Sequence, residues 1–294
     1  MLLKDILLEA IHIHPTEVDK IYNAVVKWQQ YLQSQDISQH YMTTEEYKQY
    51  TKPLRNSLQI VVRNIIKPYF KPYEELQHLK IRDKPVSAHK ISIDIWGFGA
   101  EAEYAERGSV ATKWRANWDK DNTKLYNDLN LKVTERDITN ISKGFDKTID
   151  RLVSTITHEI THLIQSLKSQ HQSGVGKIYT PRTGSEDERY LGDNIEIDAF
   201  AQSTATHILL SGKRSNNVLE AINSALQMIR FGIGHIFGVD VIKDSGQYMQ
   251  YQREFKTFTK HIDDKPLKYK QIVWRRYNKK LVEKLLKYRV QFTK

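Results

Sequence analysis

Apolar residues recur three and four positions apart along much of the chain, the spacing typical of amphipathic helices. In residues 1–85 this spacing runs through "VDKIYNAVVKWQQYL" and "LRNSLQIVVRNIIKPYF". A helix start is predicted at Thr16, and another at Thr43, where Glu46 three positions later completes a capping box. Pro68, Pro72 and Pro85 then interrupt the pattern. The sequence therefore predicts a helical N-terminal region.

The longest periodic stretch lies between Asp146 and Lys168. Its apolar positions fall on one stripe of a helix, as a core-facing helix requires. The stripe comprises Ile149, Leu152, Val153, Ile156, Ile160, Leu163, Ile164 and Leu167.

Strict alternation replaces the helical period in the segment "HKISIDIWGF", where Ile91, Ile93 and Ile95 share one side. The stretches "RGSVATKWRANW" and "LNLKVTER" also resemble strands. We expect a small sheet in this part of the chain. Further helices are predicted from Asp193 or Asn194 to Gly212, a residue suited to ending a helix, and through "NVLEAINSALQMIR".

The tail from about residue 245 is polar, basic and predicted to be helical. Its expected packing anchors are Phe255, Phe258, Ile272, Trp274, Tyr277, Leu281, Leu285 and Leu286. The predicted fold class is α+β. We expect three regions: a helical region over 1–88, a core over 89–244 that carries the sheet, and a basic extension over 245–294.

Composition narrows the chemistry. The 294 residues include no cysteine, so thiol nucleophiles, disulfides and cysteine-ligated metals are excluded, and a transition metal would need His, Asp or Glu ligands. The sequence shows neither a signal peptide nor an apolar run long enough for a bilayer, so we expect a cytoplasmic protein without membrane contact. The net charge of +10 resides in residues 253–294, which hold 14 Lys and Arg against 4 Asp and Glu.

Candidate chemistry lies in "STITHEITHLIQ", where His158 and His162 stand four residues apart with Glu159 after the first. At about 100° per residue from Ile149, the histidines fall near 180° and 220°, away from the apolar stripe. Side chains at this spacing are about 5–6 Å apart, so both imidazoles can reach one zinc ion. Glu159, near 280°, lies beside that position, where a general base is needed. The alternative interpretation is two solvated histidines on a surface helix.

A catalytic zinc site usually takes a third protein ligand. Glu196, in the first turn of the next predicted helix, is the favoured candidate, and Asp198 is the near alternative. The two acids point about 200° apart on a helix, so only one of them can face the metal. Glu196 could instead cap its own helix, because Asp193 three positions earlier gives a capping-box spacing.

The motif "HEITH" followed by "EIDAFA" resembles the gluzincin branch of zincin metallopeptidases. It is also similar to peptidases of tailed phages, with the pattern HELTHxxQ and a later EIxAxA, and distantly to ImmA/IrrE-type peptidases. The resemblance covers roughly residues 90–210. It implies a zincin-like core with a small sheet packed on the HExxH helix, zinc held by His158, His162 and Glu196, and Glu159 as general base. It also suggests the host cytoplasm or a virion as the setting.

Peptide hydrolysis needs a donor for the negative charge that develops on the carbonyl oxygen. Tyr190 is the favoured donor, and Tyr179, His171 and Arg182 are alternatives, although each could be a solvated loop residue. The leading hypothesis is thus a zinc-dependent peptidase that acts on a protein or peptide. The alternative is a non-catalytic binding or structural protein, whose basic C-terminal region contacts nucleic acid or an acidic partner.

Overall fold

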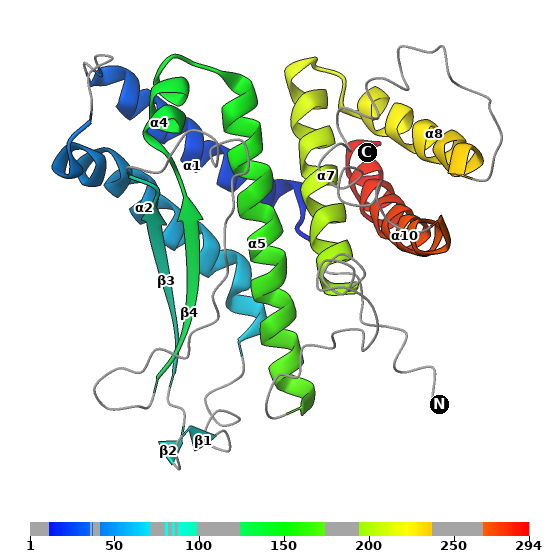
Figure 1. The fold of residues 1–294 in the computed structure, drawn as a ribbon, viewed down its shortest axis with the longest axis horizontal. Helices are drawn as coiled ribbons and strands as arrows, with labels where there is room; N and C mark the ends of the chain where they lie inside the picture. The colour runs from blue at the N-terminus through cyan, green and yellow to red at the C-terminus, as the bar shows by residue number, and fades with distance from the viewer. Residues whose placement is uncertain are drawn as a thin grey trace. The chain divides into compact units, whose positions relative to one another are not determined.

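A computed structural model describes nine stretches of the chain, and Figure 1 labels their elements. These stretches are residues 12–35, 37, 42–70, 80–81, 84–85, 88–98, 124–173, 194–236 and 267–293. By its internal contacts the chain forms two units. We call Thr16–Lys177 the continuous unit, and Met1–Pro15 together with Ile178–Lys294 the split unit. The boundaries of these two units differ from those of the three regions expected from the sequence, and the division into three regions stays a prediction.

Two helices open the continuous unit. Helix α1 (Pro15–Ser34) begins one residue before the predicted start, with proline at a position where its missing N–H costs nothing. Helix α2 (Thr44–Ile66) has the predicted capping box, since Thr43 accepts from the backbone of Glu46 and the Glu46 carboxylate accepts from the backbone of Thr43. The indole N–H of Trp28 donates to the carbonyl of Tyr50 at 2.7 Å, which ties α1 to α2.

The prediction of helix up to residue 85 is wrong at its end. After α2 a short 3-10 turn, η2 (Lys67–Tyr69), contains Pro68. Strands β1 (Lys80–Ile81) and β2 (Lys84–Pro85) then pair antiparallel. Pro68 lies in η2 and Pro85 in β2, so the helix ends close to the first proline at which the sequence pattern is interrupted.

The small sheet consists of β3 (Ala88–Trp96) and β4 (Lys124–Lys132), which run parallel from the pair Ala88↔Lys124 to Trp96↔Lys132. β3 confirms the strand predicted around Ile93. β4 begins earlier than the predicted "LNLKVTER" strand and ends before its last residues, where a helix starts. The predicted strand "RGSVATKWRANW" lies outside the described residues.

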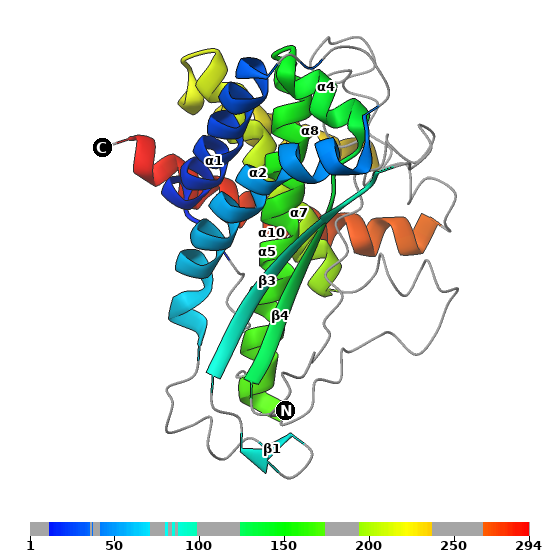
Figure 2. The same ribbon diagram turned by 90° about the vertical axis from the view of Figure 1, so that its left-hand side faces the viewer.

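One face of this sheet is covered. Ile91, Ile93 and Ile95 are buried, whereas the intervening Ser92 and Asp94 are exposed. Helix α2 packs against β3, and β4 contacts α5 (Asp146–Ser173). Figure 2 shows both strands in front of α5. The alternation read from the sequence therefore sorts the strand into a core face and a solvent face.

Helix α5 confirms the longest predicted helix, and every residue of its apolar stripe is buried. Before it stands α4 (Glu135–Ser142), whose start is fixed by a capping box between Thr134 and Asp137. Arg151 of α5 also bonds to the Asp137 carboxylate, so one carboxylate both caps α4 and joins it to α5. These contacts hold the helix that carries the two histidines.

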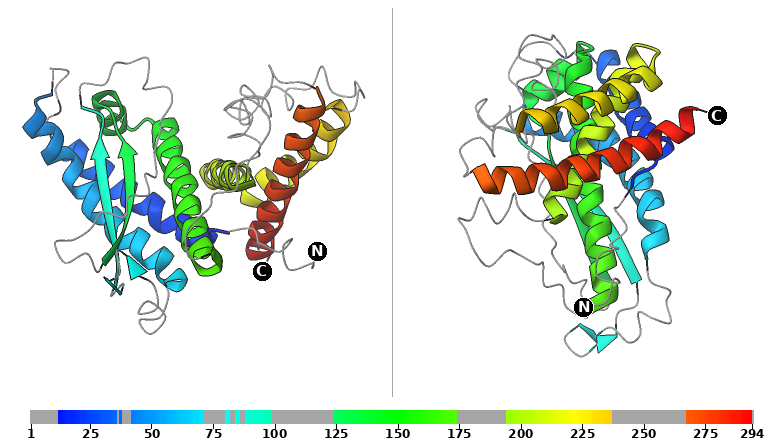
Figure 3. Two further views of the ribbon diagram at one scale, coloured as in Figure 1. Left: turned by 60° about the horizontal axis from the view of Figure 1, so that its bottom comes forward. Right: turned by 90° about the vertical axis from the view of Figure 1, so that its right-hand side faces the viewer.

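The split unit is built from α7 (Asn194–Arg214), α8 (Val218–Ile236) and α10 (Leu267–Phe292), which pack on one another. Figure 3 shows α8 and α10 side by side. Residues from the start of the chain complete this unit. The amide of Ile13 donates to Oε1 of Gln202 at 3.2 Å, and the hydroxyl of Tyr288 donates to the carbonyl of Ile13 at 3.1 Å.

Gly212 does not end α7 as predicted. The helix continues to Arg214, and the turn is made at Asn216, whose φ is 54°. A Cβ on Gly212 would lie 2.8 Å from Cα of Val218, so glycine serves the close approach of α8. Glycine can end a helix or allow a close packing contact, and the sequence alone does not distinguish these two roles.

The basic tail contains the predicted helix, α10, and four of its eight predicted anchors are confirmed. Trp274, Tyr277, Leu281 and Leu285 are buried. Ile272 and Leu286 are instead 41% and 45% exposed, because they share the solvent side of α10 with several cations. Phe255 and Phe258 lie outside the described residues.

The observed class is α+β, mostly helical with a small parallel sheet. Among the described residues, no helix combines the length and apolar character that a bilayer crossing requires.

Candidate metal centre

Helix α5 presents His158 and His162 on its half-buried side, while Ile156, Ile160 and Leu163 occupy the buried side. The four-residue spacing stacks the two imidazoles, whose ring centroids are 4.7 Å apart with planes at 81°. The facing predicted from the sequence is therefore confirmed. Neither histidine is a fully solvated surface residue.

The two rings approach each other through their Nε2 atoms, which lie 3.1 Å apart. Two ligand atoms at about 2.0–2.1 Å from a tetrahedral zinc ion are about 3.3 Å apart. The observed separation is thus close to that of two ligands of one ion. Without a metal, one Nε2 must carry a proton and donate it to the other, because two lone pairs at this distance repel.

Gln165, one helical turn beyond His162, supports the second imidazole. Its Oε1 lies 2.9 Å from Nδ1 of His162. A carbonyl oxygen can only accept, so Nδ1 carries the proton and Nε2 of His162 keeps its lone pair. Such a partner fixes the tautomer and orientation of a metal-binding histidine. The sequence interpretation missed this role, although the spacing of three residues after His162 was a usable signal.

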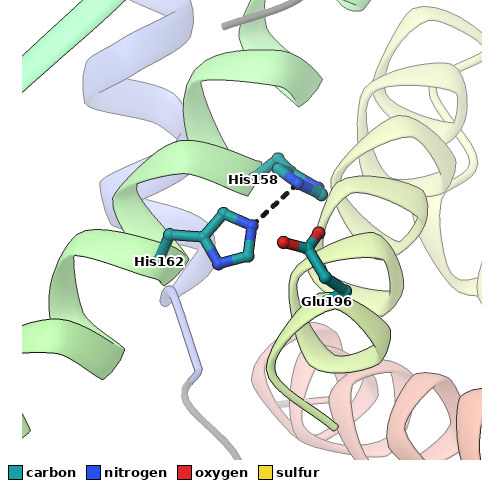
Figure 4. A group of neighbouring side chains, drawn as sticks. All are labelled: His158, His162 and Glu196. Carbon is teal, nitrogen blue, oxygen red and sulfur yellow. Dashed lines mark hydrogen bonds between the residues drawn. The ribbon is translucent and has the colours of Figure 1, made fainter. Parts of the chain in front are cut away.

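Glu196 stands in the first turn of α7. One ligand atom each of His158, His162 and Glu196 lies within 4.8 Å of the others, and the three residues form a group that could hold a metal ion. Figure 4 shows both imidazoles and the carboxylate pointing toward one another. These are the same three residues that were favoured as ligands from the sequence, and their role as ligands stays a prediction. Asp193, which would make the competing cap of α7, lies outside the described residues.

Asp198, the alternative ligand, has a different position. It is buried, and its Oδ1 lies 2.9 Å from Nζ of Lys284 in α10. The two acids occupy opposite sides of α7, as the helical spacing requires. Asp198 therefore forms an ion pair within the split unit.

Glu159, the predicted general base, follows His158 on α5 and is only 5% exposed. Its neighbours Ile160 and Thr161 are also buried, so bulk water has little access to this part of the helix. Of the candidate donors, Tyr190, Tyr179 and Arg182 lie outside the described residues. His171 belongs to α5, but its side chain is not among those described.

The basic tail contributes a separate surface. Arg275, Arg276, Lys279, Lys287 and Arg289 are exposed along α10. Lys280 lies 4.0 Å from Glu283 one turn later, a weak surface pair. Part of the charge counted in the sequence is thus exposed along α10.

Comparisons of the chain with protein-family models, with curated proteins and with solved structures found no match.

Proposed function

We propose that the chain is a zinc metallopeptidase, in which His158, His162 and Glu196 bind the ion and Glu159 is the general base. The observation that carries this proposal is the group itself: two Nε2 atoms 3.1 Å apart and a carboxylate from another helix within 4.8 Å. The HExxH spacing, the downstream glutamate and the α+β class support it. The zincin-like core belongs to the same proposal.

The donor set fits zinc. Two imidazoles and one carboxylate are a common ligand set of catalytic zinc sites, and they leave a fourth position open. When bound, zinc lowers the pKa of a water ligand and polarises a substrate carbonyl. His162 is prepared for such binding, because Gln165 holds the proton on Nδ1 and leaves Nε2 as a ligand.

Glu159 supplies the proton transfers of the reaction. Its carboxylate takes a proton from the water that attacks the peptide carbonyl carbon, and then gives that proton to the leaving amine nitrogen as the C–N bond breaks. Water is consumed, and a carboxylic acid and an amine are released. The low exposure of Glu159 favours this role, because electrostatic effects are larger where bulk water is excluded.

The test is the zinc content, by mass spectrometry, of protein purified without a metal-affinity tag. About one zinc per chain is expected in the wild type. His162→Ala and Glu196→Ala should lose the zinc or bind it weakly, whereas Glu159→Gln should keep it and lose hydrolysis of an unfolded protein substrate. A wild type that takes up no zinc after reconstitution would contradict the proposal.

Two control variants separate ligation from helix effects. Glu220 stands in the first turn of α8, is exposed, and bonds to Asn217 as a helix-start residue. Glu220→Ala should therefore leave the zinc content unchanged. His207→Ala, on the half-buried side of α7, controls for the loss of an imidazole. Loss of zinc in either control would indicate a general effect on folding.

A second candidate function is nucleic-acid binding by α10, and its exposed Arg and Lys side chains are the observation that favours it. Contacts to phosphate release counterions, so such binding falls steeply with salt. The test is titration of labelled duplex DNA at low and high salt with Arg275→Ala/Arg276→Ala. Binding that is insensitive to both changes would contradict this candidate and leave the metal site untouched.

A further inference from the structure

A buried polar seam joins α7 to α10 within the split unit. Its side chains are paired: Lys284 contacts Asp198, Tyr288 bonds to Gln202, and Tyr277 bonds to Thr204. The separations are 2.9 Å from Nζ of Lys284 to Oδ1 of Asp198, 2.8 Å from Nε2 of Gln202 to the Tyr288 hydroxyl, and 2.6 Å between the hydroxyls of Thr204 and Tyr277.

The ion pair is the most demanding member of this seam. Lys284 is fully buried and Asp198 is 5% exposed. Burial lowers the pKa of Lys284, and the charge and hydrogen bonding of Asp198 act in the opposite direction. A buried charge is tolerated only when its partner stays in place, so this contact permits little rotation of α7 against α10.

Because the ion pair limits the rotation of α7, it also sets the direction in which Glu196 projects. Asp198 and Glu196 project about 200° apart, so a helix that keeps Asp198 on Lys284 must turn Glu196 to its other side. The burial pattern follows this division. Glu196, Phe200, Ser203 and His207 are half-buried at helical spacing, whereas Asp198 and Gln202 are buried.

We propose that Lys284 is a positioning residue for Glu196: by holding Asp198 on the α10 side, it fixes the rotation of α7 that presents Glu196 as a metal ligand. This inference rests on the proposed function. It assigns a role in the metal site to a lysine of the basic tail that touches none of the ligands. It also explains why, of two acids two residues apart, one binds metal and the other does not.

The test removes the ion pair without leaving a buried charge. Replacing a buried ion pair by apolar residues of similar size is often neutral for stability, so Asp198→Val/Lys284→Met should fold. Its zinc affinity, measured by competition with a chromophoric chelator, should fall about tenfold, the lower end of the range for supporting residues of metal sites. The visible absorption of bound Co²⁺ should also change, because it reports ligand geometry.

The control is Tyr288→Phe, which removes a hydrogen bond from the same seam but leaves the ion pair. This variant should keep the zinc affinity and the Co²⁺ spectrum of the wild type. Lys284→Arg, which keeps the charge, should retain more affinity than Lys284→Met. Circular dichroism and thermal unfolding check that each variant is folded.

The outcomes separate the two proposals. Wild-type zinc affinity and an unchanged Co²⁺ spectrum in Asp198→Val/Lys284→Met would overturn the role of Lys284 and leave the metallopeptidase standing. An equal loss in Tyr288→Phe would also overturn it, since the seam would then act only as general packing. Failure of the wild type to bind zinc would overturn both.

Discussion

Oε1 of Gln165 lies 2.9 Å from Nδ1 of His162, so the imidazole donates its proton away from His158. This pair sets the tautomer of one candidate ligand before any ion arrives. A glutamine three residues after the second histidine is therefore part of the candidate site, although it touches no ligand position itself.

The first prediction concerns this pair. Gln165→Leu removes the acceptor, so Nδ1 of His162 loses its partner and the ring loses its fixed tautomer. Zinc affinity should fall by about 10–100-fold, whereas Gln165→Glu, which keeps an accepting oxygen, should stay near the wild type. Chelator competition measures both. Equal affinities of Gln165→Leu and the wild type would show that another group orients His162.

The second prediction concerns pH and His12, whose ring lies 5.2 Å from that of Tyr288. Burial, with the charges of Lys287, Lys284 and His14, lowers the pKa of His12 from 6.5 to about 3. Below about pH 6.5 the unfolded chain therefore binds a proton at His12, whereas the folded chain does not bind it until the pH nears 3. The neutral, buried His12 contributes fully to stability above the unfolded pKa, and this contribution is lost as the pH falls from about 6.5 toward 3.

The measurement is the free energy of unfolding in urea across this pH range, on metal-free protein. His12→Gln should show a shallower loss on acidification than the wild type. His14→Gln is the comparison variant, because the charge of His14 is the smallest of the causes that lower the pKa of His12, so its slope should change less than that of His12→Gln. Parallel curves for the wild type and His12→Gln would refute the assignment.

The third prediction concerns Gly97, at the end of β3. Its φ is +130°, and a Cβ there would lie 2.6 Å from the carbonyl oxygen of Val133. Gly97→Ala combines this backbone clash with an unfavourable φ and should cost about 2–4 kcal/mol. Gly144→Ala, at φ +81° but with no atom closer than 3.7 Å, should cost about 1 kcal/mol. Urea unfolding compares the two, and equal losses would show that φ alone matters.

The fourth prediction concerns Asn278, a buried residue of α10. Among the described residues neither its Nδ2 nor its Oδ1 has a hydrogen-bond partner. Asn278→Leu removes these buried polar atoms and should stabilise the protein by about 1 kcal/mol. Gln202→Leu is the contrasting variant, because Gln202 bonds to Ile13 and Tyr288, and it should destabilise. A loss of stability in Asn278→Leu would indicate a partner for the amide.

The helix α5 and its two histidines were predictable because everything needed lies within one periodic segment. The apolar stripe gives the helix, and the position of His158 and His162 off the stripe gives their facing. Glu196 could be predicted as a candidate for the same reason, since it starts the next helix. None of these inferences needs a contact between distant parts of the chain.

The choice between Glu196 and Asp198 could not be made with certainty from the sequence. It depends on Lys284, whose burial against α7 is set by the packing of α10 and has no local signal in a run of lysines and arginines. The predicted burial of Ile272 and Leu286 was wrong for a similar reason. Periodicity places a residue on a helix, but the neighbouring helices decide which side of that helix is buried.

The backbone of Ile13 is held by Gln202 and Tyr288, residues 189 and 275 positions away. The split unit therefore cannot complete this part of its core until Tyr288 has been synthesised, whereas residues 16–177 form a continuous stretch that can fold earlier. A ribosome making this protein would expose an unfinished α7 for most of the synthesis of α8 and α10. Shortening the basic tail so that Tyr288 is lost would accordingly leave the carbonyl of Ile13 without the hydroxyl that donates to it.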